Sequence, residues 1–528
     1  MPEEYIQIVH DPQANVWKSV NYPYGDLAKY SVGEKFLQTM RSIDANKVID
    51  HFYDTNAIKT AKDVYEQSIL IAINLQLMGV QHGDCVIFFS MNNEWTSVLT
   101  MGSILMGAVP NFFEVYLDNG SIKVKNLNTP PVAYLISIFY EEKYLNKIQR
   151  CLKQSTVQKQ TQLISMNCVQ LPNVKTDLLQ TPEQPVDFTN FKSIEVKDTR
   201  KETLVLVLTS GSTGLPKIVQ LSHALMMYGI HAWWDNAEHD GVLVVFSFSP
   251  LRWISQIQVM LQSLVLGPPS IYYEVLLHLD ENDTQSLASL RKVMLGGETP
   301  SKAIFDLSKK HAVNATHYRG YGMTETSTLI CCNLHINGGK PALGYEIQIL
   351  DDKLQPLGVN QPGQIALSPP YPLKGYMAMD NSKYYNERGL FINGDYGYMD
   401  EEGNLHILAR YKDLIKSNGE VIIPNTLEAA VTNAPEVYVA LLVGFRTVAN
   451  DPNETGAFFV KLHANATTTH KEEISKKVLG IMKQHLTDKQ LTIIKNIHII
   501  DSIPLTVCGK YDRGALRKLA ECKSYNEK

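Results

Sequence analysis

A stretch rich in glycine and hydroxyl side chains follows an apolar, strand-like run at residues 204–208 and ends in a lysine. It reads Thr-Ser-Gly-Ser-Thr-Gly-Leu-Pro-Lys and spans residues 209–217. Glycines let the backbone curl so that its amide groups point inward, and the hydroxyls add further donors. Lys217 supplies a positive charge for phosphate. This chemistry predicts a triphosphate cradle, although the spacing is not that of the usual P-loop; the alternative is a flexible surface loop.

The same stretch resembles the signature loop of the acyl-adenylate-forming (ANL) superfamily. Its members include acyl-CoA synthetases, 4-coumarate–CoA ligases, insect luciferases and peptide-synthetase adenylation domains. Further motifs follow in the family's order, from about residue 50 to Lys518. The resemblance implies that the chain uses ATP, Mg²⁺ and coenzyme A. It also implies that the loop binds the nucleotide through Thr209, Ser210, Gly211, Ser212, Thr213, Gly214 and Lys217.

A second hallmark of the family is similar to residues 320–326, Gly-Tyr-Gly-Met-Thr-Glu-Thr. The resemblance implies that Tyr321 stacks on adenine, that Thr324 meets the α-phosphate, and that Glu325 holds Mg²⁺. Magnesium prefers hard oxygen ligands, which a carboxylate provides. The alternative interpretation of residues 324–326 is a helix cap. The nucleotide site is also expected to include Gly297, Glu298, Gly320 and Gly322.

A third motif, Asn-Gly-Asp-Tyr-Gly at residues 393–397, resembles the one whose aspartate receives the ribose hydroxyls. A carboxylate can accept two hydrogen bonds, which matches a vicinal diol. We therefore expect Asp395 to bind ribose, and the resemblance assigns Arg410 to the same task. Asn393 is a minor departure, because relatives often have Ser or Thr there.

The resemblance places a hinge at Lys412, which we expect to be exposed as a domain-boundary residue. The predicted domains are an N-terminal adenylate-forming domain over residues 1–409, a hinge at 410–413, and a mobile lid domain over 414–528. Rotation of the lid would present a second face for the CoA step. That face is expected to include Lys416, Ser417, Asn418 and Gly419.

Near the end stands Pro-Leu-Thr-Val-Cys-Gly-Lys, which finishes at Lys510. A lone lysine on a terminal loop is normally a solvated surface residue. The family places its adenylation lysine in this setting, so the resemblance makes Lys510 a predicted catalytic residue together with Thr324 and Glu325.

The predicted acyl pocket contains Trp253, Gly296, Gly322 and Leu329. The resemblance puts the turn at 295–298 against adenine and this pocket, and a glycine-permitted strand end is the other interpretation. Trp253 stands where luciferases and many CoA ligases have His, and it forms a large apolar wall with one donor. Leu329 lies where luciferases carry small residues that leave room for a flat bicyclic acid. These departures favour an aliphatic or fatty acid as the substrate of an AMP-forming acid–thiol ligase.

Three other functions stay open. The chain could load an acyl or amino acid onto a carrier protein, but no carrier-like segment follows residue 528 and Asp235 is not clearly at the amino-acid-binding position. A luciferase-like monooxygenase is disfavoured by the pocket residues. An inactive relative used as a binding protein is disfavoured because every principal hallmark residue is present.

Alternating helical and strand-like segments must position these residues. Apolar periodicity predicts helices at 61–78 and 95–107, and apolar runs predict buried strands at 85–89 and 132–136. The alternation predicts an α/β domain with largely parallel sheets. Residues 345–410 are strand-rich, with a hairpin loop at 400–404, and a small α/β unit follows Lys412. The expected fold class is therefore α/β: a large N-terminal domain of mixed and parallel sheets with a β-rich subdomain, and a small C-terminal α/β domain, as in ANL adenylating enzymes.

The composition narrows the class of protein. A length of 528 residues suggests two or more domains, and a net charge of -5 lacks the basic excess of a nucleic-acid binder. The seven cysteines form no Cys-x-x-Cys pair, which favours reduced thiols. We see no secretory signal, no apolar run long enough to span a membrane and no Ser-Lys-Leu ending. A cytoplasmic enzyme is expected, with an organic acid, ATP and CoA as its small-molecule partners.

Overall fold

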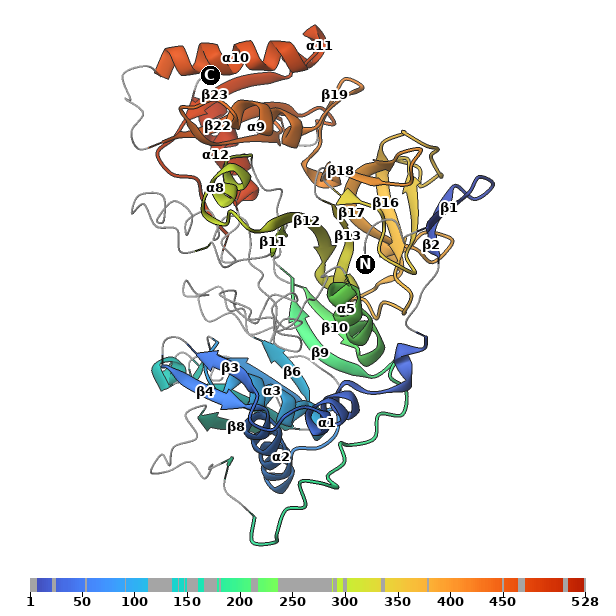
Figure 1. Cartoon of the computed structure of the whole chain (residues 1–528). Coiled ribbons are helices and arrows are strands. Elements are labelled where there is room, and N and C mark those ends of the chain that lie inside the picture. The colour runs from blue at the N-terminus through green and yellow to red at the C-terminus, as the bar shows by residue number, and fades with distance from the viewer. Residues whose placement is uncertain are drawn as a thin grey trace.

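The computed structural model extends from the C-terminal helices at one end to a largely parallel sheet at the other (Figure 1). It describes residues 7–20, 25–52, 55–90, 92–112, 135–140, 142–146, 148–149, 160–165, 178–179, 182–209, 217–235, 287, 292–297, 302–333, 338–377, 379–448, 451–463, 471–506 and 511–526.

The largely parallel sheet has the strand order β10-β9-β6-β5-β7-β8 among the described residues, and β10 runs antiparallel to β9. Its strands are β5 (Cys85–Phe89), β6 (Val109–Phe112), β7 (Leu135–Tyr140), β8 (Gln160–Ser165), β9 (Thr203–Leu208) and β10 (Ile218–Ser222). The predicted strand at 85–89 is confirmed. The one predicted at 132–136 overlaps β7, which continues to Tyr140; residues 132–134 lie outside the described ranges.

Four helices accompany this sheet in the described part of the chain: α1 (Val32–Ser42), α2 (Ala61–Leu77), α3 (Thr96–Leu105) and α5 (His223–Asp235). Before α2 the hairpin of β3 (Val48–Phe52) and β4 (Ala57–Thr60) packs at the same end. The helix α2 begins with a capping box between Thr60 and Asp63, and Gly79 follows its end with a φ of 89°. The helices predicted at 61–78 and 95–107 are confirmed.

An antiparallel sheet with the order β1-β2-β15-β16-β17-β18-β14 lies beside the first. Its strands are β1 (Gln7–Asp11), β2 (Val16–Val20), β14 (Gly338–Gly339), β15 (Glu346–Leu350), β16 (Gly363–Ser368), β17 (Phe391–Met399) and β18 (Leu405–Arg410). The predicted hairpin at 400–404 joins β17 to β18, where the Asp400 amide donates to the Asn404 carbonyl at 3.0 Å. Strands β1 and β2, which extend this sheet at its edge, were not predicted from the sequence.

A smaller sheet connects the two ends of the molecule (Figure 1). It consists of β11 (Lys292–Gly296), β12 (Thr316–Met323) and β13 (Thr328–Asn333), with α8 (Lys302–His311) between the first two strands. Strands β11 and β12 are parallel, and β12 and β13 are antiparallel. The 3₁₀ helix η5 (Thr324–Thr326) follows β12, so the second hallmark motif lies at the end of a strand.

The residues after β18 form a C-terminal unit, residues 415–526, with its own apolar core. Its strands are β19 (Ile415–Ser417), β20 (Glu420–Ile422), β21 (Val437–Phe445), β22 (Thr455–Leu462) and β23 (Ile494–Ile499). Its helices are α9 (Pro424–Thr432), α10 (Lys471–His485), α11 (Asp488–Leu491) and α12 (Arg513–Asn526). The small α/β unit predicted after Lys412 is present in this form.

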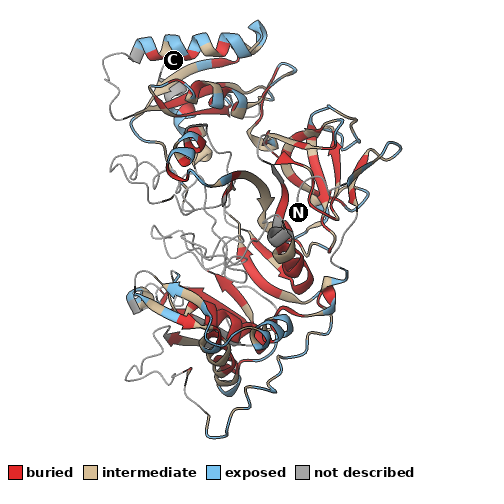
Figure 2. Cartoon of the chain, viewed as in Figure 1, coloured by how far each residue is buried: buried red, intermediate tan, exposed pale blue. Residues whose placement is uncertain are grey.

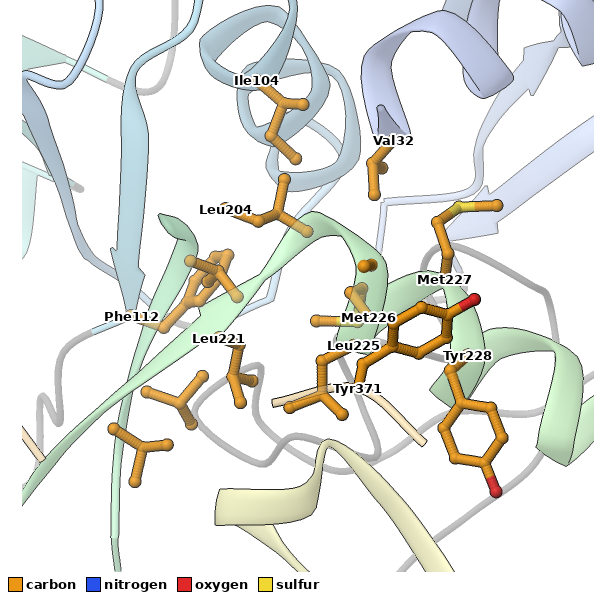
Figure 3. Close-up of a cluster of buried hydrophobic side chains, with 14 of the residues drawn as sticks. Val32, Ile104, Phe112, Leu204, Leu221, Leu225, Met226, Met227, Tyr228 and Tyr371 are labelled. Carbon is orange, nitrogen blue, oxygen red and sulfur yellow. The ribbon is translucent and has the colours of Figure 1, made fainter. Parts of the chain in front are cut away.

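The main core joins the parallel and antiparallel sheets through α5. Figure 3 shows Leu225, Met226 and Tyr228 of this helix in one cluster with Leu221 and Tyr371. The Tyr228 hydroxyl donates to the Leu343 carbonyl at 2.7 Å, so its polar end is satisfied. Burying each such large side chain contributes about 1.5–3 kcal/mol.

Burial follows the sheets through the molecule. Figure 2 shows buried residues concentrated in the strands, whereas much of α10 is exposed. None of the helices in the described ranges is both long and apolar enough to cross a membrane.

Candidate active site

Strands β12, β17 and β18 bring together the residues predicted to bind the nucleoside. Asp395 and Arg410 are direct partners in the β17–β18 register, and Arg410 Nε lies 3.0 Å from Asp395 Oδ1. The hydroxyl of Tyr321 donates to Asp395 Oδ2. Asn393 completes the group: its side-chain amide donates to the Tyr321 hydroxyl at 2.7 Å, and its Oδ1 accepts from the Asp395 amide at 2.9 Å. We call these four residues the ribose-side network.

The charges of the ribose-side network compensate one another. The Asp395 side chain is only 5% exposed, whereas that of Arg410 is 48% exposed. The Asp395 carboxylate raises the pKa of Arg410. Burial, and then Asp395, raises the pKa of Tyr321, so its hydroxyl stays protonated and serves as a donor. A buried carboxylate is tolerated here because it has an ionic partner, Arg410, and a hydrogen bond from Tyr321.

Glycines on the neighbouring strands β11 and β12 allow the two backbones to approach each other closely. Gly296 is the register partner of Gly320. A Cβ at Gly296 would meet the Gly320 carbonyl oxygen at 2.7 Å, and one at Gly320 would meet Leu329 Cδ2 at 2.8 Å. Leu329 is buried and is the register partner of Gly322 across β12 and β13. Four of the residues predicted for the adenine and acyl pocket are therefore neighbours.

The two ends of the glycine-rich stretch meet through the backbone. The Thr209 amide donates to the Lys217 carbonyl at 2.9 Å, and the Lys217 amide donates to Thr209 Oγ1 at 3.1 Å. These bonds join the end of β9 to the start of β10 at the base of the loop. Its intervening residues lie outside the described ranges.

Lys217 and Glu325 are joined by a residue that sequence analysis missed. The Tyr376 hydroxyl donates to Glu325 Oε1 at 2.6 Å, and the Tyr376 ring lies 4.3 Å from Lys217 Nζ. Lys217 Nζ also donates to the Tyr384 hydroxyl at 3.2 Å. The sequence signal was weak, because it consisted of a Gly-Tyr pair at 375–376. In the structure, Gly375 has a φ of 75°. We call Lys217, Glu325, Tyr376 and Tyr384 the phosphate-side cluster.

The helix-cap interpretation of residues 324–326 is not supported. The N-cap of η5 is Met323, which makes no side-chain capping bond, and the Thr324 carbonyl accepts from the Ser327 amide at 3.1 Å. The short helix instead presents Glu325 to Tyr376.

A magnesium ion implied by the family fits the donor set around Glu325. The described residues contain no group of three His, Cys, Asp or Glu side chains that could hold a metal by themselves. A single carboxylate suits Mg²⁺, which usually keeps several waters and takes phosphate oxygens as further ligands. Glu325 would hold the ion, and the ion would neutralise charge on the phosphate groups.

Two residues of the predicted hinge contact helix α12. Arg517 donates to the Lys412 carbonyl at 3.2 Å and to Asp413 Oδ1 at 2.6 Å. Our expectation that Lys412 is exposed is wrong: it is partly buried, and burial lowers its pKa to about 8. Arg517 of α12 contacts the backbone of this residue, which sequence position alone would leave in water.

The residues predicted for the CoA step form the β19–β20 hairpin. Asn418 and Gly419 occupy its turn with φ angles of 50° and 79°, as a type I′ turn requires. Lys416 Nζ lies 2.9 Å from Asp352 Oδ2 and 4.2 Å from the centre of the Tyr411 ring. Lys416 thus connects the C-terminal unit to the loop that follows β15.

Several predicted residues cannot be placed relative to this site. Ser210, Gly211, Ser212, Thr213, Gly214, Trp253, Glu298 and Lys510 lie outside the described residues. Of the others, Gly297 follows β11 directly, with a φ of 85°.

Known proteins resemble this chain in sequence and in fold. Firefly (Photinus pyralis) luciferin 4-monooxygenase is 25% identical over 87% of this chain and 88% of its own. Acetyl-coenzyme A synthetase of Bacillus subtilis is 25% identical over 93% of this chain and 90% of its own. The crystal structure of the anthranilate CoA ligase AuaEII in complex with anthranoyl-AMP matches with a TM-score of 0.77 and 18% identity, over 94% of this chain and 98% of that one.

The structural match confirms the predicted ANL adenylating-enzyme fold. The sequence matches the family described as AMP-binding enzyme over residues 38–274 and 263–377, which is more than half of its length. With this match over most of the chain, the protein belongs to the AMP-binding enzyme family.

Proposed function

We propose that the chain is an AMP-forming acid–thiol ligase that activates a carboxylic acid with ATP and transfers the acyl group to coenzyme A. The observation that supports this most strongly is the presence of both charge systems in one fold: a paired Asp395–Arg410 for the nucleoside, and Lys217 with Glu325 for the triphosphate. Relatives that include CoA synthetases align over most of the chain, which supports CoA as the acceptor.

In the first half-reaction a substrate carboxylate oxygen attacks the α-phosphorus of ATP. The bond to the bridging oxygen breaks, and pyrophosphate leaves. Charge accumulates on phosphoryl oxygens, so positioning and electrostatic stabilisation supply most of the catalysis. Lys217 and the backbone of its loop hold the phosphates, Asp395 and Arg410 hold the ribose, and Lys510 bridges the carboxylate and α-phosphate.

In the second half-reaction the thiolate sulfur of CoA attacks the acyl carbonyl, and AMP leaves as the bond to its phosphate oxygen breaks. We place the rotation that admits the thiol at Lys412, between residues 1–409 and 414–528. The contacts of Arg517 with Lys412 and Asp413 support this position, because they tie the chain to the C-terminal unit immediately after Arg410 of β18.

The acid is proposed to be aliphatic. Leu329 is buried, and its Cδ2 methyl group lies 2.8 Å from where a Cβ at Gly320 would stand, so it fills space beside β12. A large leucine there narrows the pocket for a flat bicyclic acid.

ATP–pyrophosphate exchange with purified protein and a panel of acids tests the first half-reaction. We expect exchange with one or more aliphatic acids, and thioester formation when CoA is added. Exchange without a thioester, followed by loading of a supplied carrier protein, would favour the carrier-loading alternative. Absence of exchange with every acid would contradict the proposal.

A further inference from the structure

Tyr376 contacts two groups of opposite charge in the phosphate-side cluster. Its hydroxyl donates to Glu325, and its ring faces the ammonium group of Lys217. Within the described residues, this tyrosine connects Lys217 and Glu325, which form no ion pair of their own. The side chain therefore contacts both a cation and an anion, whose opposite charges attract each other.

The backbone fixes Tyr376 independently of these two partners. Tyr376 forms an antiparallel bridge with Val219 of β10, and the Met377 amide donates to the Ile218 carbonyl at 2.9 Å. The residue is only 6% exposed. Its position beside Lys217 is thus set by the strand that follows the glycine-rich loop.

The surrounding rings hold the Tyr376 side chain in place. The Tyr384 ring packs edge-on against it with centroids 5.0 Å apart, and Phe391 lies 6.4 Å away. Lys217 Nζ lies 4.6 Å from the centre of the Tyr384 ring, so two aromatic faces share one ammonium group. Aromatic faces attract cations without neutralising them.

The protonation state of Tyr376 suits a donor. An ordinary tyrosine hydroxyl, with a pKa of ~10, is protonated at neutral pH. The proton is therefore retained and is directed at Glu325 Oε1, which orients the carboxylate.

We propose that Tyr376 is a positioning residue that keeps Lys217 and Glu325 apart and oriented, so that the ammonium group meets a phosphate and the carboxylate meets Mg²⁺. This inference rests on the proposed function. If the two charges paired directly, an incoming metal–nucleotide complex would first have to separate them. With Tyr376 between them, each charge is held by weaker contacts that the ligand can replace.

Calorimetry on the full chain, with ATP as the probe, measures this role. Each protein is titrated once in excess MgCl₂ and once in EDTA. For Tyr376→Phe, which keeps the ring and removes the hydroxyl, we expect ATP affinity to fall about tenfold with Mg²⁺ and to stay unchanged in EDTA. Titration with Mn²⁺ in the presence of ATP, followed by electron paramagnetic resonance, should show the same loss in metal affinity.

Two neighbouring tyrosines provide matched comparisons. Tyr384→Phe removes a hydroxyl from Lys217 and leaves the Glu325 contact intact, so ATP affinity should fall equally with and without Mg²⁺. Tyr385→Phe removes a hydroxyl from a ring that packs on Phe391 at 5.5 Å, and it should change neither titration. A loss selective for magnesium in Tyr376→Phe alone supports the positioning role.

A substitution of Glu325, the acceptor of the Tyr376 hydrogen bond, tests whether the loss comes from this contact or from a general effect on folding. Glu325→Gln should show the same magnesium-selective loss, and the double variant with Tyr376→Phe should be no worse than Glu325→Gln alone. Equal losses in both titrations, or none, for Tyr376→Phe would overturn the inference while the ligase proposal stands. If the unmodified chain binds ATP equally with and without Mg²⁺, the positioning role is overturned together with the assigned role of Glu325.

Discussion

The ribose side and the phosphate side of the site treat charge in opposite ways. On the ribose side, Asp395 and Arg410 form an ion pair at 3.0 Å, and Tyr321 adds a hydrogen bond. On the phosphate side, Lys217 and Glu325 each contact Tyr376 instead of each other. One region is neutralised within the protein, and the other keeps its charges separate.

The difference follows from what each region is proposed to bind. Ribose hydroxyls are neutral, so a paired carboxylate can accept their hydrogen bonds without leaving a buried charge uncompensated. A triphosphate and a metal ion bring their own charges, and oriented protein charges then stabilise them without reorganisation. Variants that remove one charge at a time should therefore behave differently in the two regions.

The largest effect is expected at Lys510, the cation that the resemblance adds to the phosphate side. Lys510→Ala should reduce acyl-adenylate formation by roughly 10²–10³-fold, the loss typical of one electrostatic contact to the transition state. Thioester formation from a supplied acyl-adenylate should survive, because that step does not need the lysine. Pyrophosphate exchange and the thioester assay check this in one preparation.

Lys518→Ala offers a comparison for Lys510→Ala, because Lys518 is an exposed lysine on α12. It should leave both assays unchanged. Normal pyrophosphate exchange in Lys510→Ala would show that Lys510 is a surface residue.

On the ribose side, Asp395→Ala should weaken ATP binding by on the order of 1.5–3 kcal/mol, the usual contribution of a hydrogen bond to a charged group. The loss should be similar with and without Mg²⁺, in contrast to Tyr376→Phe. Calorimetry checks it, with Glu402→Ala in the exposed turn before β18 as the control. Unchanged ATP affinity would mean that the ion pair of Asp395 and Arg410 only stabilises the β17–β18 hairpin.

The elements near the site were predictable where local patterns decide them. The apolar run at 85–89 and the turn residues at 400–404 predict a strand and a hairpin that the structure contains. The family resemblance assigned Asp395 and Arg410 to one task, and in the structure the β17–β18 hairpin makes them register partners.

Contacts between distant segments were not predictable in this way. Tyr376 and Glu325 are separated by 51 residues, and nothing in the local pattern around either indicates the other. Strands β1 and β2 were missed because β2 pairs with β15, far along the chain. Lys412 was expected in water, and nothing near it in the sequence indicates the contact of its carbonyl with Arg517, 105 residues later.

A smaller effect is expected at Lys412, which follows the ribose side by two residues. It lies in the 3₁₀ helix η7 (Tyr411–Asp413), whose usual φ range includes the value near −65° that proline imposes. Lys412→Pro should therefore trap the observed orientation of the C-terminal unit. One half-reaction should persist and the other should fall several-fold.

Lys412→Ala separates the effect of restricting the backbone from the effect of losing the charge, because it removes the ammonium group and leaves φ free. It should retain both half-reactions better than Lys412→Pro. Equal losses of pyrophosphate exchange and thioester formation in the proline variant, at an unchanged Tm, would argue against a pivot at this residue.

The smallest effect is the pH dependence of stability that Lys412 contributes. Burial lowers its pKa to about 8, and Asp413 opposes the shift while Arg410 adds to it. In the unfolded chain a lysine titrates near pH ~10.4. Between these values the unfolded state binds more protons than the folded state, so this residue makes stability increase as pH rises. Below pH 8 the lysine is charged in both states, and its burial destabilises the fold fully.

Replacing Lys412 with methionine keeps an apolar stem of similar length and removes the buried charge. Lys412→Met should have a higher Tm than the unmodified chain at neutral pH, and the advantage should shrink as pH rises above 8. Other groups titrate equally in both proteins, so the difference in Tm isolates the contribution of this residue. A difference in Tm that stays constant from neutral pH to pH ~10 would show that burial does not lower the pKa of Lys412.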